Sequence, residues 1–181
     1  MVEDDLQRKL QVLAEITRRL RLDGIRPVLV GGTAVQLYTA GAYATADMDI
    51  VVSDRQRAAQ VLHEMGFQAH GRHWFHPVWE VAIEIPDTDL AGDYSRLLEL
   101  ELPDGSIIFC IGIEDLIVDR LNAAAHWQSV EDRRWAKELL REHAVQIDWS
   151  YLRARVEQEG TTQALQELWQ EVQADAQNAV E

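Results

Sequence analysis

The sequence predicts an α/β (α+β) protein in which a small mixed sheet with flanking helices is followed by a C-terminal helical bundle. Within residues 28–52, two apolar runs rich in β-branched residues enclose a short helical stretch that begins at a glycine pair. Alternating segments separated by Gly, Pro and Asp turns fill residues 67–112, and the periodicity beyond them is helical. We therefore expect an α/β core over residues 1–112 and a helical region over residues 113–181 that packs on this core.

Spacing, capping and stop residues locate the first elements of the core. Leucine and isoleucine at intervals of three and four predict an amphipathic helix over 4–23, and Gly24 is typical of a helix end. The next elements are predicted as a buried strand over 28–30 behind Pro27, a short helix over 33–40, a strand over 48–52, and a helix over 54–65 that is capped by Asp54 and stopped by Gly66.

The second half of the core and the tail differ in hydrophobic period. Antiparallel or mixed strands are predicted within 67–71, 73–85, 95–103 and 106–112, with a Pro-Asp-Gly turn at 103–105. Helices are predicted over 113–127, 130–143, 149–158 and 161–175.

The composition is that of a soluble globular protein, with 47% hydrophobic and 27% charged residues in 181. No apolar stretch approaches the ~18 to 20 residues of a membrane span. The N-terminus lacks the basic-then-apolar order of a signal peptide, and the single cysteine, Cys110, lies in an apolar run. These features predict a cytoplasmic protein with no membrane partner.

The net charge of −14 disfavours an extensive nucleic-acid surface, because cationic side chains that neutralise phosphates dominate such binding. A local basic face around Arg18, Arg19, Arg21 and Arg26 is the one arrangement that would offset this charge. The last helix carries an apolar stripe that suits either packing on its own domain or a homodimer.

Two acids on the second strand suggest metal chemistry. Alternation along a strand places Asp47 and Asp49 on one face, where their charges repel unless a cation neutralises them. Mg²⁺ prefers such carboxylate oxygens, and two ions bridged by acids can promote phosphoryl or nucleotidyl transfer. Glu84, between Ile83 and Ile85, is the candidate third acid, with Glu80 on the same predicted strand as its substitute.

The glycine pair Gly31 and Gly32 precedes a helix and is followed by Thr33. Glycines let backbone N–H groups approach a phosphate, and the N-terminus of a helix favours an anion. A plain tight turn is the alternative interpretation of the pair alone, and the acids that follow favour the phosphate site.

Three histidines, His70, His73 and His76, lie close together in the sequence. Their spacing matches no known zinc motif and no cysteine joins them, so a polar hairpin is the favoured interpretation. One histidine that contacts substrate is compatible with this interpretation.

The stretch "VGGTAVQLYTAGAYATADMDIVV" resembles the signature of the nucleotidyltransferase fold superfamily, in which a glycine turn precedes Asp-x-Asp by about a dozen residues. The resemblance extends over about residues 27–142 and includes "IGIEDLIVDRLNAAAHWQSVEDRRWAKELL" in the helical part. The most similar branch contains small bacterial proteins related to the toxin component of AbiE-type toxin–antitoxin systems.

The resemblance implies a role for each candidate residue. Asp47, Asp49 and Glu84 would be catalytic and bind Mg²⁺, with two ions and Mn²⁺ as the substitute metal. The nucleoside triphosphate would bind at Gly31, Gly32, Thr33 and Arg120.

Three positions depart from the pattern of this superfamily. Tyr43 stands where many relatives carry Arg, Arg120 where they often carry Lys, and Trp135 where a second acid of the following helix is common.

The implied activity is metal-dependent transfer of a nucleoside monophosphate from an NTP to an acceptor hydroxyl on RNA, protein or a small molecule. The alternative is a non-catalytic binding module with the same scaffold, or a toxin–antitoxin component that binds an antitoxin partner.

Overall fold

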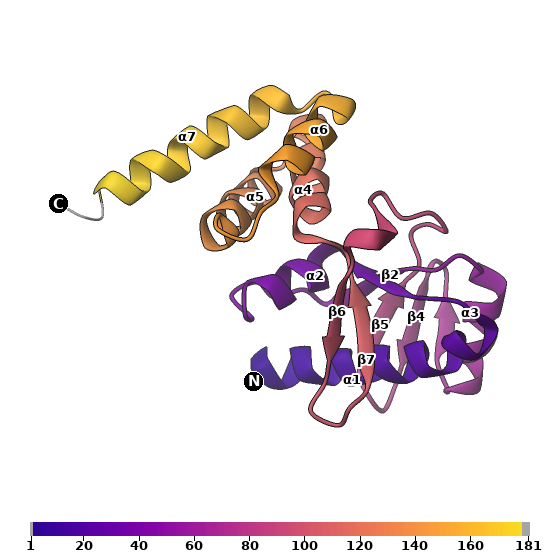
Figure 1. Ribbon diagram of the computed structural model, residues 1–181. Coiled ribbons are helices and arrows are strands. Elements are labelled where there is room, and N and C mark those ends of the chain that lie inside the picture. The colour runs from indigo at the N-terminus through magenta and orange to yellow at the C-terminus, as the bar shows by residue number, and fades with distance from the viewer. Residues whose placement is uncertain (1, 179–181) are drawn as a thin grey trace. The chain divides into compact units, whose positions relative to one another are not determined.

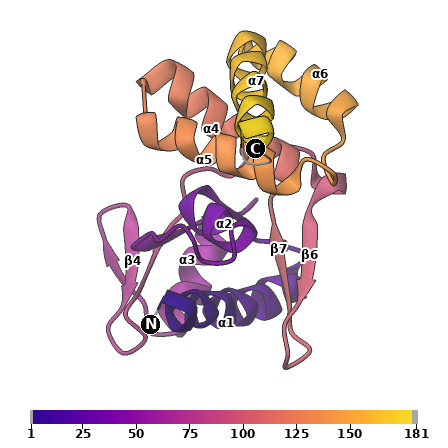
Figure 2. The ribbon, with the colours of Figure 1, turned by 90° about the vertical axis from the view of Figure 1, so that its left-hand side faces the viewer.

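A computed structural model of the chain describes residues 2–178, and the side chains of residues 5–178. It confirms the predicted fold class: a mixed sheet with flanking helices comes first, and the chain beyond it is helical (Figure 1). Within the described residues the sheet has seven strands, in the order β3-β4-β5-β2-β1-β7-β6. Figure 2 shows β4 and β6 at opposite sides of the part of the protein that contains the sheet, with α1 between them.

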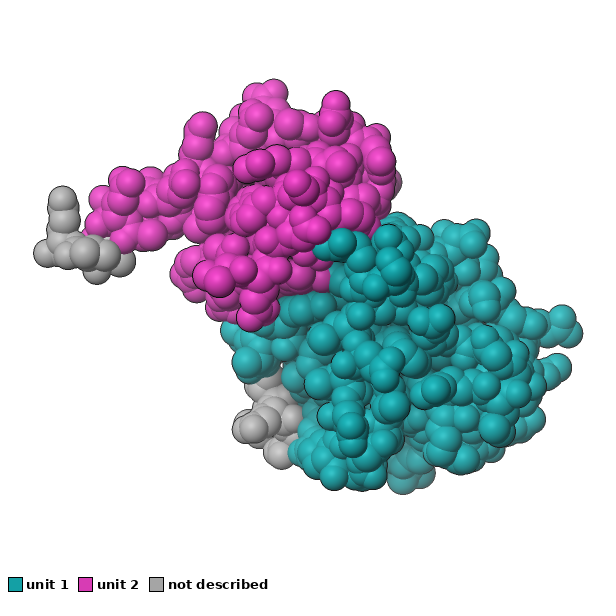
Figure 3. Space-filling view, in the orientation of Figure 1, with its two compact units in different colours: residues 1–112 teal, residues 113–181 magenta. Residues whose placement is uncertain are grey.

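The chain is divided into two compact units, which comprise residues 1–112 and residues 113–181 (Figure 3). The first unit contains, in chain order, α1 (Val2–Leu20), η1 (Arg21–Asp23), β1 (Val28–Val30), α2 (Gly31–Tyr38), β2 (Asp47–Val51), α3 (Arg55–Glu64), β3 (Gln68–His70), β4 (His73–His76), β5 (Val81–Glu84), η2 (Tyr94–Arg96), β6 (Leu98–Glu101) and β7 (Ile107–Cys110).

The sheet is mixed because β1 runs parallel to β7 and β2 runs parallel to β5, whereas the other neighbours are antiparallel. One of its faces is apolar: Met48, Ile50 and Ile83 are fully buried there. Leu13 and Ile16 of α1 are equally buried, and α1 packs against β7 and α3. Since side chains alternate along a strand, residues 47, 49 and 84 lie on the opposite face.

The segment 73–85 forms two strands rather than one. A turn over residues 77–80 separates β4 from β5, and Glu80 lies in it with a φ of 54°. The expectation that Glu80 shares a strand with Glu84 was therefore wrong, because the chain reverses direction at this turn.

The second unit consists of α4 (Ile113–Trp127), α5 (Val130–His143), α6 (Trp149–Glu159) and α7 (Thr162–Asn178). The rings of Trp149 and Trp169 meet at a centroid distance of 4.4 Å between α6 and α7. Asp115, which is buried in α4, accepts hydrogen bonds from the Tyr151 hydroxyl and from Nε of Arg155. These contacts hold α6 against α4. None of the described helices has the length and apolar character needed to cross a bilayer.

A buried lysine connects α1 to the loop that leads into β2. Lys9 is 1% exposed, and its Nζ donates a 2.6 Å hydrogen bond to the carbonyl oxygen of Thr45. The same ammonium lies 2.8 Å from Oδ2 of Asp5, one turn earlier in the helix. Because a buried charge is tolerated only when it is paired, these contacts fix the loop immediately before Asp47.

Replacement of Lys9 by Met should lower the free energy of unfolding by about 1–3 kcal/mol, because the Thr45 carbonyl loses a buried charged donor. Urea unfolding monitored by circular dichroism measures this change. The matched control is Arg18→Met on the same helix, where the ion pair with Glu15 is exposed and the loss should be smaller. Equal losses in the two variants would contradict the structural role of Lys9.

Candidate functional site

Strand register collects polar side chains on one face of the sheet. Asp49 of β2 lies opposite Glu84 of β5, and Glu84 lies opposite His73 of β4. Residues in register on neighbouring strands point to the same face, and Asp47 shares that face with Asp49. The two carboxylates of β2 are thus joined by a third carboxylate and an imidazole.

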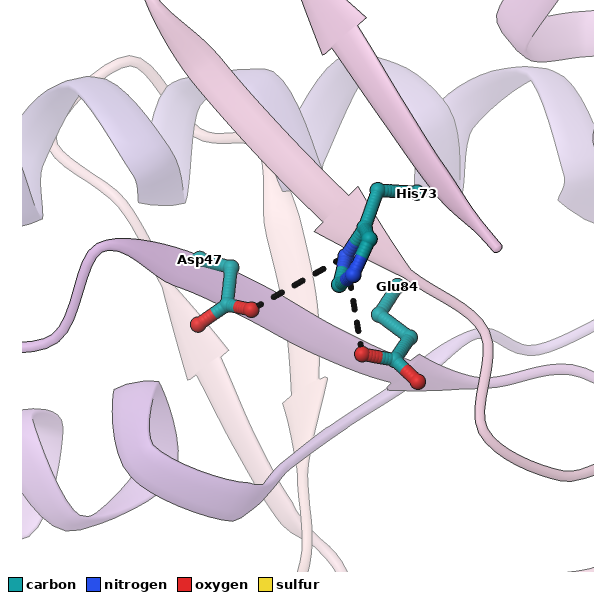
Figure 4. A group of neighbouring side chains, drawn as sticks. All are labelled: Asp47, His73 and Glu84. Carbon is teal, nitrogen blue, oxygen red and sulfur yellow. Dashed lines mark ion pairs between the residues drawn. The ribbon is translucent and has the colours of Figure 1, made fainter. Parts of the chain in front are cut away.

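Three of these side chains point toward one another (Figure 4). Nδ1 of His73 lies 3.5 Å from Oε2 of Glu84 and 3.9 Å from Oδ2 of Asp47. One ligand atom from each of the three residues lies within 4.8 Å of the others. Glu84 is 14% exposed, whereas Asp47 and His73 are more than one-third exposed, so this cluster is open to solvent.

Asp49 lies directly against the glycine turn. A Cβ atom on Gly31 would stand 2.2 Å from Oδ2 of Asp49, closer than any non-bonded contact allows. Gly31 also has a φ of +63°, a conformation that side chains other than glycine's rarely adopt. Glycine at this position therefore satisfies two requirements: the backbone turn into α2 and the space that the Asp49 carboxylate occupies.

The two residues after Gly31 are covered by the chain around them. A Cβ atom on Gly32 would lie 3.0 Å from the Tyr43 ring and 3.1 Å from Thr45. Thr33 is fully buried, and its hydroxyl donates a 2.8 Å hydrogen bond to the backbone oxygen of Asp47. The Thr33 hydroxyl thus fixes the start of β2, and this buried side chain is not the group that a ligand would meet at the start of α2.

An exposed cation borders the cluster. Nε of Arg72, in the turn between β3 and β4, lies 3.3 Å from Oε1 of Glu84 and donates a 3.3 Å hydrogen bond to Nε2 of His73. The Arg72 side chain is 77% exposed. A cation on such an exposed side chain offsets part of the negative charge and can be displaced by another cation.

The donor set fits a divalent ion. Two atoms bound to one ion at about 2.0–2.2 Å are at most about 4.4 Å apart. The separations of 3.5 and 3.9 Å from the imidazole to the two carboxylates satisfy this limit. Asp47, Glu84 and His73 can therefore hold a cation after small side-chain movements, and Asp49 adds a further carboxylate beside them.

The sequence model of a protein family described as nucleotidyltransferase of unknown function (DUF6036) matches residues 6–174. The chain belongs to this family. The match spans both units, and it confirms the relationship to nucleotidyltransferases that the glycine pair and the paired acids indicate in the sequence. No curated protein sequence matches the chain.

Solved structures with the same fold are also nucleotidyltransferases or resemble them. An antigenic nucleotidyltransferase-like protein from Paracoccidioides brasiliensis is similar with a TM-score of 0.62 and 15% identity, over 94% of this chain and 93% of that protein. ANT(2'')-Ia in complex with adenylyl-2''-tobramycin is similar with a TM-score of 0.51 and 14% identity, over 81% of this chain and 98% of that protein. The solution structure of the antibiotic-resistance factor ANT(2'')-Ia gives a TM-score of 0.54 at 12% identity, over 98% and 100% of the two chains. At these identities the likeness concerns the fold.

Two of the three residues that depart from the superfamily pattern, Arg120 and Trp135, lie in the second unit. Nη1 of Arg120 contacts Oδ1 of Asp132 at 2.7 Å, and its Nη2 contacts Oδ2 of Asp119 at 2.5 Å. Trp135 is buried in α5, so it belongs to the core of the second unit. Arg120 thus connects α4 to α5 through its ion pair with Asp132.

The three histidines, which the sequence predicts to share one polar hairpin, have different surroundings in the structure. His76 is buried, stacks on Trp79 and accepts a hydrogen bond from the Trp79 backbone N–H through Nδ1. His70 is exposed at the edge of the sheet. His73 joins the acids, a position that sequence reasoning missed. The feature of the sequence that points to this position of His73 is the two-residue link Gly71-Arg72, which joins β3 and β4 in a tight hairpin.

Gly31→Ala should destabilise the protein and impair the site, because the added methyl group must displace the Asp49 carboxylate. The backbone strain alone costs about 1–2 kcal/mol, and the clash adds to this cost. Gly24→Ala is the matched control, since its φ is +73° but nothing lies within 4 Å of its Cβ position. Thermal unfolding and Mg²⁺ titration compare the two variants. Similar stability losses and unchanged Mg²⁺ affinity in both would contradict the close approach of Gly31 and Asp49.

Proposed function

We propose that this protein transfers a nucleoside monophosphate from an NTP to an acceptor hydroxyl and releases pyrophosphate. The observation that carries the proposal is the placement of Asp47, Asp49 and Glu84 on one face of the sheet, with Asp49 against Gly31 at the start of α2. Membership in a nucleotidyltransferase family supports this activity, and the open face leaves room for substrates.

Asp47, Asp49 and Glu84 are the residues that would hold divalent ions, with two Mg²⁺ ions expected and Mn²⁺ as the substitute. Such ions, when bound, supply charge neutralisation for the triphosphate and lower the pKa of an attacking hydroxyl. Without a cation, the carboxylates of Asp47 and Asp49 on one strand face repel each other. That repulsion favours cation binding.

The triphosphate would bind at the start of α2. The first backbone N–H groups of a helix have no partner within the helix, and the helix dipole favours an anion there. The partly exposed Gly31 and Gly32 would supply these N–H groups, while the buried Thr33 holds the turn in place through its bond to Asp47. Because Asp49 lies against Gly31, a phosphate at this turn would be adjacent to the acids that hold the cations.

Glu84 is the proposed general base. The acceptor oxygen would attack the α-phosphorus, and its proton would pass to the Glu84 carboxylate. A new bond forms between the acceptor oxygen and phosphorus as the bond from the α-phosphorus to the bridging oxygen breaks, and pyrophosphate leaves. The low exposure of Glu84, 14%, suits a group that exchanges a proton with a bound substrate.

The acceptor is proposed to be a neutral or cationic molecule. A net charge of −14 repels a large polyanion such as RNA and attracts cations. ANT(2'')-Ia, which shares the fold, was solved with adenylyl-2''-tobramycin. Tobramycin is therefore a concrete first probe for a small hydroxyl acceptor.

One observation favours a second candidate, the same scaffold as a non-catalytic binding module or toxin–antitoxin component. The Tyr43 ring lies against Gly32, at the turn where the triphosphate is proposed to bind. A ring in this position narrows the approach to the Gly32 backbone. Transfer of label from α-³²P-NTP to tobramycin or to a component of a cell extract distinguishes turnover from binding alone.

Asp49→Asn should abolish Mg²⁺-dependent NTP binding while the fold persists, because the substitution removes a carboxylate charge but keeps the side-chain volume. Calorimetric titration of each of the four ribonucleoside triphosphates, with Mg²⁺ and then with EDTA, measures this loss. Asp54→Asn is the matched control: Asp54 is an exposed N-cap of α3, and asparagine caps equally well. NTP affinity that is unchanged in Asp49→Asn would count against the proposed site.

A further inference from the structure

We propose that His73 is a metal ligand, and that its nitrogen makes this site prefer a later first-row transition-metal ion such as Co²⁺ to Mg²⁺. The inference rests on the proposed function in one respect, namely that a cation binds at Asp47 and Glu84. It adds a ligand from a third strand, β4, and a chemical preference that three carboxylates alone would not give.

The imidazole is aimed at the acids. The same atom, Nδ1 of His73, lies 3.5 Å from Glu84 Oε2 and 3.9 Å from Asp47 Oδ2 (Figure 4). A cation among these atoms would replace two long contacts with three bonds of about 2.0–2.2 Å. Among the described residues, this is the group of three metal-ligating side chains that lies close enough to share an ion.

The strand register makes this geometry robust. His73 lies opposite Glu84 on the neighbouring strand, so the two Cβ atoms are held about 4.5–5.5 Å apart on one face. His70 is the register partner of His73 on the outer strand and shares its face. It lies one strand farther from the acids, and the cluster of possible ligands does not include it.

Ligand chemistry gives the preference. Mg²⁺ binds oxygen ligands and keeps most of its water, whereas imidazole suits the later first-row ions. A set of two carboxylates and one imidazole therefore strengthens binding of Co²⁺ more than binding of Mg²⁺.

Arg72 competes with the ion. Its Nε contacts Oε1 of Glu84 and donates to Nε2 of His73, both at 3.3 Å. A neutral imidazole that binds a metal through Nδ1 carries its proton on Nε2, so it cannot accept this hydrogen bond. The ion must therefore displace Arg72 from His73. Removing the arginine should then increase metal affinity, an effect opposite in sign to that of removing the histidine.

The test is calorimetric titration of Co²⁺ and, separately, Mg²⁺ into the full chain without nucleotide, with Co²⁺ absorption as a direct report of nitrogen coordination. His73→Ala should weaken Co²⁺ binding by about tenfold or more and leave Mg²⁺ affinity within about threefold. His73→Gln, which retains polarity and bulk, should behave in the same way. His70→Ala is the matched control and should change neither affinity. Arg72→Met should increase the affinity for Co²⁺.

The outcomes separate the two proposals. One outcome overturns only the role of His73 and leaves the cation site in place. In it, Asp47→Asn loses Co²⁺ binding, while His73→Ala and His73→Gln keep the wild-type Co²⁺ affinity and absorption. Equal weakening of Co²⁺ and Mg²⁺ in both His73 variants overturns the preference. If the folded wild-type chain binds neither ion, the metal assignment of the proposed function fails, and the role of His73 fails with it.

Discussion

The register of four neighbouring strands is the constraint on which the rest of the site depends. Pairing of β1 with β2 places Val30 opposite Asp49, and the next two pairings bring Glu84 and His73 into the same row. A shift of one residue in any pairing would turn a polar side chain into the apolar face, where Met48 and Ile83 are buried. The burial of one face of the sheet thus fixes the chemistry of the other.

The glycine turn and the acids form one structural unit. Val30 ends β1 opposite Asp49, so the next residue, Gly31, begins α2 beside that carboxylate. Thr33 then donates to the backbone of Asp47, and Lys9 donates to the carbonyl of Thr45 just before it. These partly buried hydrogen bonds hold the start of β2 in place, while the acids themselves remain accessible to solvent. A rigid strand with an open polar face is a suitable arrangement for binding a cation and a phosphate.

Local patterns in the sequence predict most of the fold. Apolar spacing, the Asp54 cap and the Gly24 stop give the helices, and alternation gives Asp47 and Asp49 a common face. The positions of Glu80 and His73 are harder to predict from the sequence, because they depend on where the chain turns between β4 and β5. That turn includes Glu80 at positive φ, a conformation that glutamate rarely adopts and that sequence alone does not reveal. The contact of Asp49 with Gly31 depends on strand pairing, so the sequence indicates the glycines only as a phosphate turn or a plain tight turn.

The most direct test of the central claim, that this face of the sheet binds a divalent ion next to the glycine turn, is a crystal structure with Mn²⁺ and a non-hydrolysable NTP, with anomalous diffraction to locate the metal. The account predicts an anomalous peak about 2.0–2.3 Å from carboxylate oxygens of Asp47 and Glu84, with the triphosphate at Gly31 and Gly32. Triphosphate bound elsewhere, or manganese peaks only at sites away from these acids, would contradict it.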